Sequence, residues 1–572
     1  MSDVAILAAL GLIFGALIVF RVFRRLQLSL AKHPSLRGHA KWSRRLARLV
    51  AYYEFNAQDF FTSDGAPRDV ADQRRAALAR LKAQALEENP RSLAYSAELT
   101  ASVSDVAFTS AYRVPFPYRA QLPEALRQTP MVEETRGVRI RDVDGNWRYD
   151  LSGSYGVNVF GYDFYKACIE QATASAGSLG PVLGPYHPLI VDTVQKIRQI
   201  SGLDEVSFHM SGTEAVMQAV RLARYHTGRS HLVRFCGAYH GWWDGVQPGV
   251  GNQRRVNDVY TLRDVSARTL RVLETRRDIA CVLVNPLQAL HPNADAPGDA
   301  TLLGSNRSAG CDRAGYSRWL QELREVCTRR GIVLIFDEVF TGFRLGYRGA
   351  QEYFGVQADM VTYGKSLGGG LPVGVLCGVH RLMQRFKPAQ PANISFARGT
   401  FNSHPYVIAA MHEFLARLQT ESCQQIYATA DEVWETRLAT LNARLHAHGL
   451  PVQLAGLQSI WTVLYLRPSR YNWMFQFYLR AAGLELGWIG SGRIILSLNY
   501  SDDDFEAVVE RFVRAAQAMQ ADGWWWQSPA LSNAGIRRQL AREMLQARLG
   551  LLKPAPAAAA GEHLTASAES AQ

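Results

Sequence analysis

The segment 362-TYGKSLGGGLPVG-374 holds a single lysine, which precedes a serine, a leucine and three glycines in a row. Gly-Lys-Ser occurs in nucleotide-binding loops, but these need the pattern G-x-x-x-x-G-K-[ST] between a strand and a helix. Counting back from Gly364 puts Asp359 where the first glycine of that pattern belongs. Pro372 follows the glycines and favours a loop that returns into another strand. We therefore exclude a nucleotide loop here.

Lys365 can instead be a nucleophile. A lysine amine forms a Schiff base with a carbonyl, and pyridoxal phosphate makes this adduct useful because the cofactor acts as an electron sink. Such a site needs a carboxylate beside the pyridine nitrogen, a cradle for the phosphate and a group against the face of the ring. Each of these has a candidate elsewhere in the sequence.

The carboxylate is predicted at Asp337, in 332-IVLIFDEVFTGFR-344. The apolar residues before it predict a buried strand that ends at the aspartate, and ligands of open α/β sheets bind beyond the carboxyl ends of strands. A helix-capping aspartate is the alternative interpretation. Lys365 follows the next predicted strand, and the two residues together are more specific than either alone.

The phosphate cradle is predicted at Ser211, Gly212 and Thr213, which precede a segment with apolar residues at helical spacing. A helix N-terminus with small residues presents free amides and a positive dipole end to a phosphate. Ser211 and Glu214 also form a capping box, which is compatible with phosphate binding.

Two further segments offer groups for the cofactor. Tyr239 lies in 235-FCGAYHGWWDG-245, where a strand runs into a glycine-containing turn, and its ring is a candidate for stacking. An aromatic residue at a strand end is otherwise a packing residue. Thr400, in 398-RGTFNSHP-405, is a candidate hydroxyl donor.

The pattern around these residues predicts an α/β fold. Short apolar strands begin near residues 231, 280, 332, 359 and 375 and alternate with helices, which favours a mostly parallel sheet covered on both faces. Strands at 459–466 and 493–498 and a helix over 502–519 predict a smaller α+β domain after it.

The totals exclude several classes of protein. The chain has 572 residues, 48% of them hydrophobic, which favours more than one packed domain. Its seven cysteines contain no C-x-x-C, so neither a disulfide framework nor a zinc site is predicted, and no metal is expected. The net charge is +12, but most of the excess lies in the first 48 residues, so a nucleic-acid-binding body is not expected.

The N-terminus predicts a membrane anchor. Residues 4–20 are uninterruptedly apolar, near the minimum length for a spanning helix. Nine lysines and arginines and no acidic residue follow between Arg21 and Arg48. Positive charges after the helix predict a cytoplasmic body, with the basic stretch on anionic head groups of membrane lipid.

Five segments resemble, in order and spacing, the class III (fold type I) pyridoxal phosphate aminotransferases, most closely the glutamate-1-semialdehyde aminomutase branch. The resemblance covers about residues 131–520, through the segments SGTEAVMQAVRLAR, AYHG, FDEVFTGFR, YGKSLGGGLPVG and GTFNSHP. It implies that Lys365 is the Schiff-base lysine and that Asp337 pairs with the pyridine nitrogen of pyridoxal 5'-phosphate.

The resemblance also implies the remaining cofactor contacts and the assembly. Ser211, Gly212 and Thr213 would surround the phosphate, and Tyr239 would stack on the ring. Thr400 would reach the phosphate of the neighbouring subunit, so a homodimer is implied. The expected domains are a transmembrane anchor at 1–23, a basic helical extension at 24–130, an N-terminal aminotransferase segment at 131–165, a large domain at 166–405, a small domain at 406–550 and a disordered tail at 551–572.

Departures from the family pattern bear on the substrate. Asn285 stands where many relatives have glutamate, Phe340 where ordinary ω-aminotransferases carry glutamine, and Arg493 is the one candidate for a substrate carboxylate. We therefore predict an aminotransferase that acts on an aldehyde or ketone of a lipidic or carrier-tethered intermediate. A 2,1-aminomutase is the alternative, and a catalytically silent membrane scaffold is disfavoured because Lys365 and Asp337 are both present.

Overall fold

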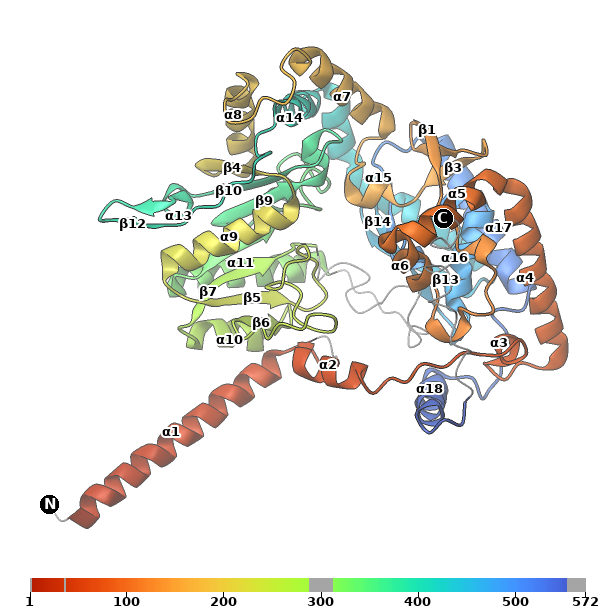
Figure 1. Ribbon diagram of the computed structural model, residues 1–572, viewed down its shortest axis with the longest axis horizontal. Helices are drawn as coiled ribbons and strands as arrows, with labels where there is room; N and C mark the ends of the chain where they lie inside the picture. Colours follow the sequence, from red (N-terminus) through yellow and green to blue (C-terminus); the bar gives the residue numbers. More distant parts are fainter. Residues whose placement is uncertain (1–2, 35–37, 288–311, 553–572) are drawn as a thin grey trace, which may run out of the picture. The chain divides into compact units, whose positions relative to one another are not determined.

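The computed structural model describes residues 3–34, 38–287 and 312–552, and side chains from residue 10 onward. The chain forms two compact units (Figure 1). Of the described residues, unit 1 holds those up to 47, 165–287 and 312–427, and unit 2 holds 48–164 and 428–552. The segment 288–311 and most of the predicted disordered tail lie outside the described residues.

A seven-stranded sheet is the centre of unit 1. The strand β10 runs antiparallel to both of its neighbours and the other strands run in one direction, which confirms the predicted, mostly parallel sheet. In spatial order the strands are β4 (Glu205–His209), β10 (Gly374–Gly378), β9 (Met360–Gly364), β8 (Val333–Asp337), β7 (Ile279–Val284), β5 (His231–Phe235) and β6 (Val259–Leu262).

Helices cover this sheet because its central strands are buried along their whole length. Every residue of β7, β8, β9 and β10 is buried, as expected for strands with helices on both faces. The apolar side of α9 (Gly212–Thr227), which includes Val216 and Val220, packs on β10, β9 and β7. On the other strands lie α10 (Ala267–Thr275) and α11 (Arg313–Arg330), while α7 (Tyr162–Ala176), α8 (Leu189–Ser201), α12 (Gly349–Phe354), α13 (His380–Met383), α14 (Pro405–Arg417) and the hairpin β11 (Phe386–Lys387) and β12 (Gln390–Ile394) complete the unit.

Unit 2 joins both ends of the aminotransferase sequence with the helical extension. The side chains of Arg74 and Asp64 form a buried ion pair at 2.7 Å, and Nε of Arg74 donates to the carbonyl oxygen of Gly523 at 2.9 Å. Arg470 forms a second buried pair, with Glu543 at 2.6 Å. These bonds hold α4 (Arg68–Glu88) and α18 (Asn533–Arg548) on the same core.

The other elements of unit 2 are two small sheets and several helices. The predicted strand 459–466 is β14 (Ile460–Tyr465), and the predicted helix 502–519 is α17 (Asp502–Ala521). The remaining elements are β1 (Val132–Arg136), β2 (Arg139–Asp142), β3 (Trp147–Asp150), β13 (Val452–Leu457), β15 (Leu484–Glu485), β16 (Ile494–Ile495), α3 (Asp59–Thr62), α5 (Pro90–Ser102), α6 (Ser104–Tyr112) and α16 (Phe475–Ala481), with α15 (Glu421–Ala447) starting in unit 1.

The N-terminal helix differs from the predicted anchor. α1 (Asp3–Ala31) continues past residue 23, because its last turns pack on α10 of unit 1. Among the residues that the structure describes, no helix combines the length and the apolar character needed to cross a bilayer. The prediction of a membrane-spanning segment is therefore not supported.

Candidate active site

The predicted site residues lie at one edge of the unit 1 sheet. The strands β4, β5, β8 and β9 run in the same direction, so their carboxyl ends meet at this edge, where ligands of open α/β sheets bind. Ser211 follows β4, Tyr239 follows β5, Asp337 ends β8 and Lys365 follows β9.

Glycines let the loops at this edge approach one another closely. A Cβ atom on Gly212 would lie 2.7 Å from Cγ1 of Val339, and one on Gly364 would lie 3.2 Å from the same methyl group. Gly241 has φ +90°, and a Cβ there would collide with the hydroxyl of Thr213. The segments after β4, β5, β8 and β9 are therefore in contact, and they bring the predicted residues 211–213, 239, 337 and 365 together.

Asp337 is buried and fully hydrogen-bonded. One carboxylate oxygen, Oδ2, accepts from Nδ1 of His240 at 2.7 Å. The other, Oδ1, accepts from the amide of Val339 at 3.1 Å and from the hydroxyl of Thr362 at 3.3 Å. Thr362 is the register partner of Asp337 in the β8–β9 pair. Three groups, from the segments after β5 and β8 and from β9, therefore fix the orientation of this carboxylate.

His240 is the buried side chain that donates a hydrogen bond to Asp337. The side chain is 2% exposed, and burial lowers the pKa of His240, while the charge of Asp337 opposes that shift. Because a carboxylate only accepts hydrogen bonds, Nδ1 carries the proton and the imidazole is held in one tautomer. Its Nε2 is buried with no hydrogen-bond partner in the described residues.

Tyr239 and Lys365 stand at the same edge. The ring of Tyr239 is 59% exposed, and burial of its hydroxyl followed by the charge of Asp337 raises its pKa. Lys365 has φ +43°, a conformation that costs a non-glycine residue about 1–2 kcal/mol. Its Nζ lies 5.9 Å from the centroid of the Phe340 ring. Such strain is characteristic of functional positions.

The N-terminus of α9 forms the predicted cradle. Ser211 caps the helix, and its hydroxyl accepts from the amide of Glu214 at 3.3 Å. The carboxylate of Glu214 accepts in return from the amide of Met210 at 2.9 Å, one residue before the cap. The first-turn amides of Gly212 and Thr213 remain available for an anion at the positive end of the helix.

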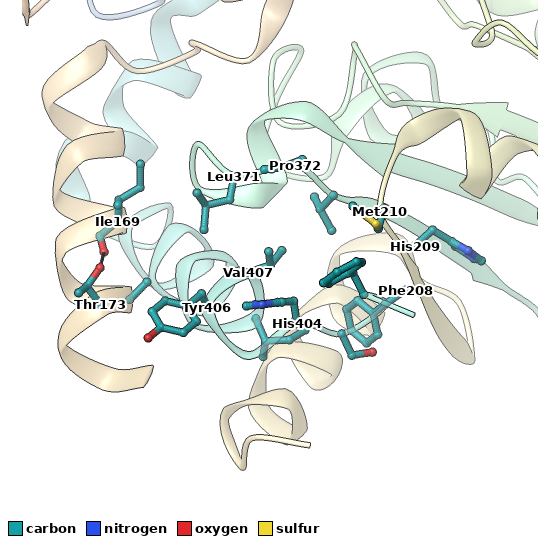
Figure 2. Close-up of a pocket in the computed structure, with 15 residues that line it drawn as sticks. Ile169, Thr173, Phe208, His209, Met210, Leu371, Pro372, His404, Tyr406 and Val407 are labelled. Atoms are coloured by element: carbon teal, nitrogen blue, oxygen red, sulfur yellow. Dashed lines mark hydrogen bonds between the residues drawn. The ribbon is translucent and has the colours of Figure 1, made fainter. Parts of the chain in front are cut away.

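Thr400 lies apart from the other predicted residues. It is exposed, and it makes no hydrogen bond in the part of the chain that the structure describes. The adjoining residues Phe401 and His404 line a cavity of about 350 Å³ that Phe208 and Met210 also border. Figure 2 shows Met210, Leu371, His404 and Tyr406 around this space. The loop of Thr400 therefore borders the segment that leads to Ser211 without completing the cradle.

Two residues of the site were not predicted. His240 is the neighbour of Tyr239 in the sequence, and Thr362 lies in the strand before Lys365. A signal for Thr362 exists in the sequence, since it is the only threonine in the apolar run of β9 and lies opposite Asp337 once the two strands are paired. Of the candidates for the substrate side, Asn285 caps a turn and accepts from the amide of Leu287 at 3.2 Å, and Arg493 lies half-buried in unit 2.

Comparison with known proteins identifies the family to which this site belongs. The sequence pattern of the family described as Aminotransferase class-III matches residues 123–516, well over half of the chain. The chain belongs to the class-III aminotransferase family.

Relatives of this aminotransferase include two glutamate-1-semialdehyde 2,1-aminomutases. The one from Nitratidesulfovibrio vulgaris (strain DP4) is 31% identical over 395 residues, which are 66% of this chain and 90% of the relative. The one from Methanocaldococcus jannaschii is 31% identical over 353 residues, 58% of this chain and 76% of the relative.

Solved structures agree with the fold. A transaminase with PLP bound has a TM-score of 0.57 and 27% identity, and the alignment covers 69% of this chain and 92% of that chain. A glutamate-1-semialdehyde aminomutase from Pseudomonas aeruginosa PAO1 has a TM-score of 0.62 at 20% identity, covering 78% and 99%, which shows the fold alone. The predicted fold type I architecture and class-III transaminase are confirmed.

The residues of this class-III aminotransferase fit pyridoxal 5'-phosphate. Asp337 offers a buried carboxylate to a protonated ring nitrogen, and Lys365 offers an amine at the same edge. The N-terminus of α9 offers the first-turn amides of Gly212 and Thr213 to the phosphate. The predicted cofactor, pyridoxal 5'-phosphate, is therefore confirmed.

Proposed function

We propose that this class-III aminotransferase moves an amino group from an amino donor to an aldehyde or ketone on an apolar, lipid- or carrier-linked molecule. The observation that supports amino transfer is the convergence of Asp337, buried on His240 and Thr362, with Lys365 at the same sheet edge. When bound, pyridoxal phosphate supplies the electron sink for a carbanion beside the amine.

Each side chain then has a defined task. Lys365 holds the cofactor aldehyde between turnovers and, once displaced, moves the proton at the substrate carbon as a general base. Asp337 keeps the ring nitrogen protonated, and His240 orients Asp337. Tyr239 packs against the ring.

The phosphate contacts extend across two subunits in this proposal. Gly212 and Thr213 bind the phosphate with their amides, and Ser211 caps the helix that presents them. Thr400 reaches the phosphate of the partner in a homodimer. Its exposed position beside an apolar cavity is compatible with burial by a second copy. Sedimentation velocity of the purified chain tests the dimer.

A visible absorbance band tests the cofactor and its lysine. The chain purified with pyridoxal phosphate is expected to show the band of the lysine-bound cofactor, and Lys365→Ala is expected to lose it. Conversion of the band by an amino donor, followed by recovery with a carbonyl acceptor, is the signature of two half-reactions. A chain that binds the cofactor but never exchanges the band with any donor would contradict the proposal.

Unit 2 carries an exposed aromatic cluster on α6. Phe108 and Tyr112, on α6, have ring centroids 5.2 Å apart, and Tyr112 lies 5.5 Å from Trp488. Phe108 is 57% and Tyr112 43% exposed, which is unusual for such a cluster on a soluble surface. The helix α6 precedes the matched residues 123–516, so it belongs to the extension of this chain.

A series of straight-chain aldehydes tests the apolar acceptor. Burial of one methylene contributes about 0.8 kcal/mol, so KM is expected to fall about fourfold for each added methylene that the enzyme buries. An unchanged KM along the series would remove this part of the proposal.

Membrane association is part of the same proposal. Between Leu10 and Phe23 the apolar side chains of α1 are 47–76% exposed, and contact with lipid would cover them. The catalytic units would then lie on the cytoplasmic side, where basic residues accumulate. Flotation of the full chain with vesicles tests this association independently of catalysis.

A 2,1-aminomutase is the second candidate function, and the relatives at 31% identity favour it. An aminomutase interchanges an amino and a carbonyl group within one molecule and needs no separate donor. Turnover of glutamate 1-semialdehyde by the chain with bound pyridoxamine phosphate, with no other amine present, would establish this activity. Turnover that depends on a second amine would establish the transferase.

A further inference from the structure

The last turns of α1 are fixed to the catalytic unit along α10. Nη1 of Arg24 donates to the carbonyl oxygen of Thr275 at 2.5 Å, and the amide of Arg263 donates to the carbonyl oxygen of Ala31 at 2.9 Å. Thr275 ends α10 and Arg263 precedes it, so residues 24–31 run antiparallel beside this helix (Figure 1). Whatever binds the exposed part of α1 is therefore held against unit 1.

The helix α2 (Ala40–Ala47) lies against unit 1 as well. Nη1 of Arg44 donates to the carbonyl oxygens of Asn252 at 3.2 Å and Arg254 at 3.3 Å. Trp42 on the same helix is 57% exposed, with the guanidinium of Arg45 5.3 Å from its ring centroid. An exposed tryptophan among arginines is typical of a helix at a membrane–water interface.

The exposed apolar residues of α1 favour lipid over a protein partner. They lie on every side of the helix and are 47–76% exposed: Leu10, Leu12, Ile13, Phe14, Leu17, Ile18, Val19, Phe20, Val22 and Phe23. A second copy of the chain, or another protein, would cover a stripe about 100° wide. Lipid surrounds a helix on all sides.

The surface around these residues is basic. We call it the basic side, and it consists of residues 21–25, 40–47, 252–255 and 267–277. Glu274 is the only acidic residue in these segments and pairs with Arg329 at 3.3 Å, while Arg254 pairs with Asp244, outside them, at 3.4 Å. The exposed cations of the basic side are Arg21, Arg25, Lys41, Arg45, Arg254, Arg255, Arg268, Arg271 and Arg277.

From these contacts the geometry points to an anionic lipid surface bound by the basic side, with the catalytic unit itself contributing Arg255, Arg268 and Arg271. This inference rests on the proposed membrane association and goes beyond it, because the cations of α10 and of residues 252–255 belong to the aminotransferase domain and not to the N-terminal run. The cations of the catalytic unit then bind the anionic head groups of the membrane, and α1 supplies the apolar contact.

Vesicle binding tests the inference with two double variants of the full chain. Arg255→Gln with Arg271→Gln removes two cations from the basic side. The control, Arg221→Gln with Arg381→Gln, removes two exposed cations on α9 and α13, so the net charge falls equally. Binding is measured by co-sedimentation with phosphatidylcholine vesicles, with and without about a third phosphatidylglycerol.

The basic-side variant is expected to bind the anionic vesicles about 30-fold more weakly than the unchanged chain, since each cation near such a surface contributes about 1 kcal/mol. Binding to neutral vesicles should be the same for all three proteins, and the control should match the unchanged chain on both. Equal binding of the two variants to anionic vesicles, or wild-type binding without any preference for the anionic lipid, would overturn the inference. Amino transfer to a soluble aldehyde, measured without lipid, reports on the proposed function separately.

Discussion

The pair formed by His240 and Asp337 allows a matched test. In His240→Asn the amide nitrogen of the side chain takes the place of Nδ1, whereas His240→Leu has nearly the same shape and no donor. The hydrogen bond between His240 and Asp337, which the Leu variant lacks, is short at 2.7 Å. Both residues are buried, with 2% and 3% of their surfaces exposed. Among the described residues Oδ2 of Asp337 then has no other donor, while Oδ1 keeps Val339 and Thr362.

The expected cost follows from this geometry. A hydrogen bond to a charged group contributes about 1.5–3 kcal/mol. The free energy of unfolding of His240→Leu should therefore be lower than that of His240→Asn by about this amount. The measurement is urea denaturation of the cofactor-free chain, followed by circular dichroism. The affinity for pyridoxal phosphate, titrated by absorbance, should also fall in the Leu variant. Each 1.4 kcal/mol of binding free energy that is lost because Asp337 is no longer oriented lowers this affinity about tenfold.

The result that would refute the reasoning is equal stability of the two variants. His240 would then be a packing residue, and Asp337 would be held by its other partners alone. Equal stability with unequal cofactor affinity would instead show that the imidazole acts only once the cofactor is present.

Further predictions concern stability, pH and the lysine. Asp64→Asn leaves Arg74 buried without its anion and should lower the free energy of unfolding by about 3–5 kcal/mol, measured by urea denaturation, and adding Arg74→Met should recover part of this loss. Burial, and then the charge of Arg385, lower the pKa of His209 to about 4, so the unfolded chain binds the extra proton and stability falls as the pH drops from about 6.5 towards 4. His209→Gln should remove about 2 kcal/mol of that loss at pH 5, and identical pH profiles for the two proteins would contradict it. Lys365→Ala should reduce kcat by several orders of magnitude while leaving the urea midpoint of the cofactor-free chain nearly unchanged, since alanine keeps the Cβ atom and with it the strain at φ +43°.

The parts of the fold that were predictable are those with a local signal. Runs such as Ile279–Val284 and Val333–Asp337 are apolar throughout, so a buried parallel sheet follows from them, and the carboxyl edge then brings Asp337 and Lys365 together. The strand β4 and the short edge strand β6 carry mixed residues and were not predicted. They are strands because they pair with β10 and β5, and their own composition does not indicate it.

The parts that were not predictable depend on contacts distant in sequence. The contact of His240 with Asp337 joins residues 97 apart, and it needs the order of the strands before it can be inferred. The apolar pattern of the N-terminal helix changes after Phe23, yet the helix continues to Ala31 because α10 packs against its last turns. Polar residues such as Gln27 are used there in contacts with Thr275 that no local rule indicates.

The buried pairs of unit 2 have a consequence for the order in which the chain acquires its structure during synthesis. Arg74 bonds to Gly523, and the carbonyl of Ser63 accepts from Arg470, so residues near the start of the chain wait for partners made more than 400 residues later. The strands of the seven-stranded sheet lie between these partners in the sequence and are complete by residue 378. On the ribosome, domains generally fold as units as they emerge. The catalytic sheet is therefore able to close first, while the extension remains without its core until α18 has been synthesised.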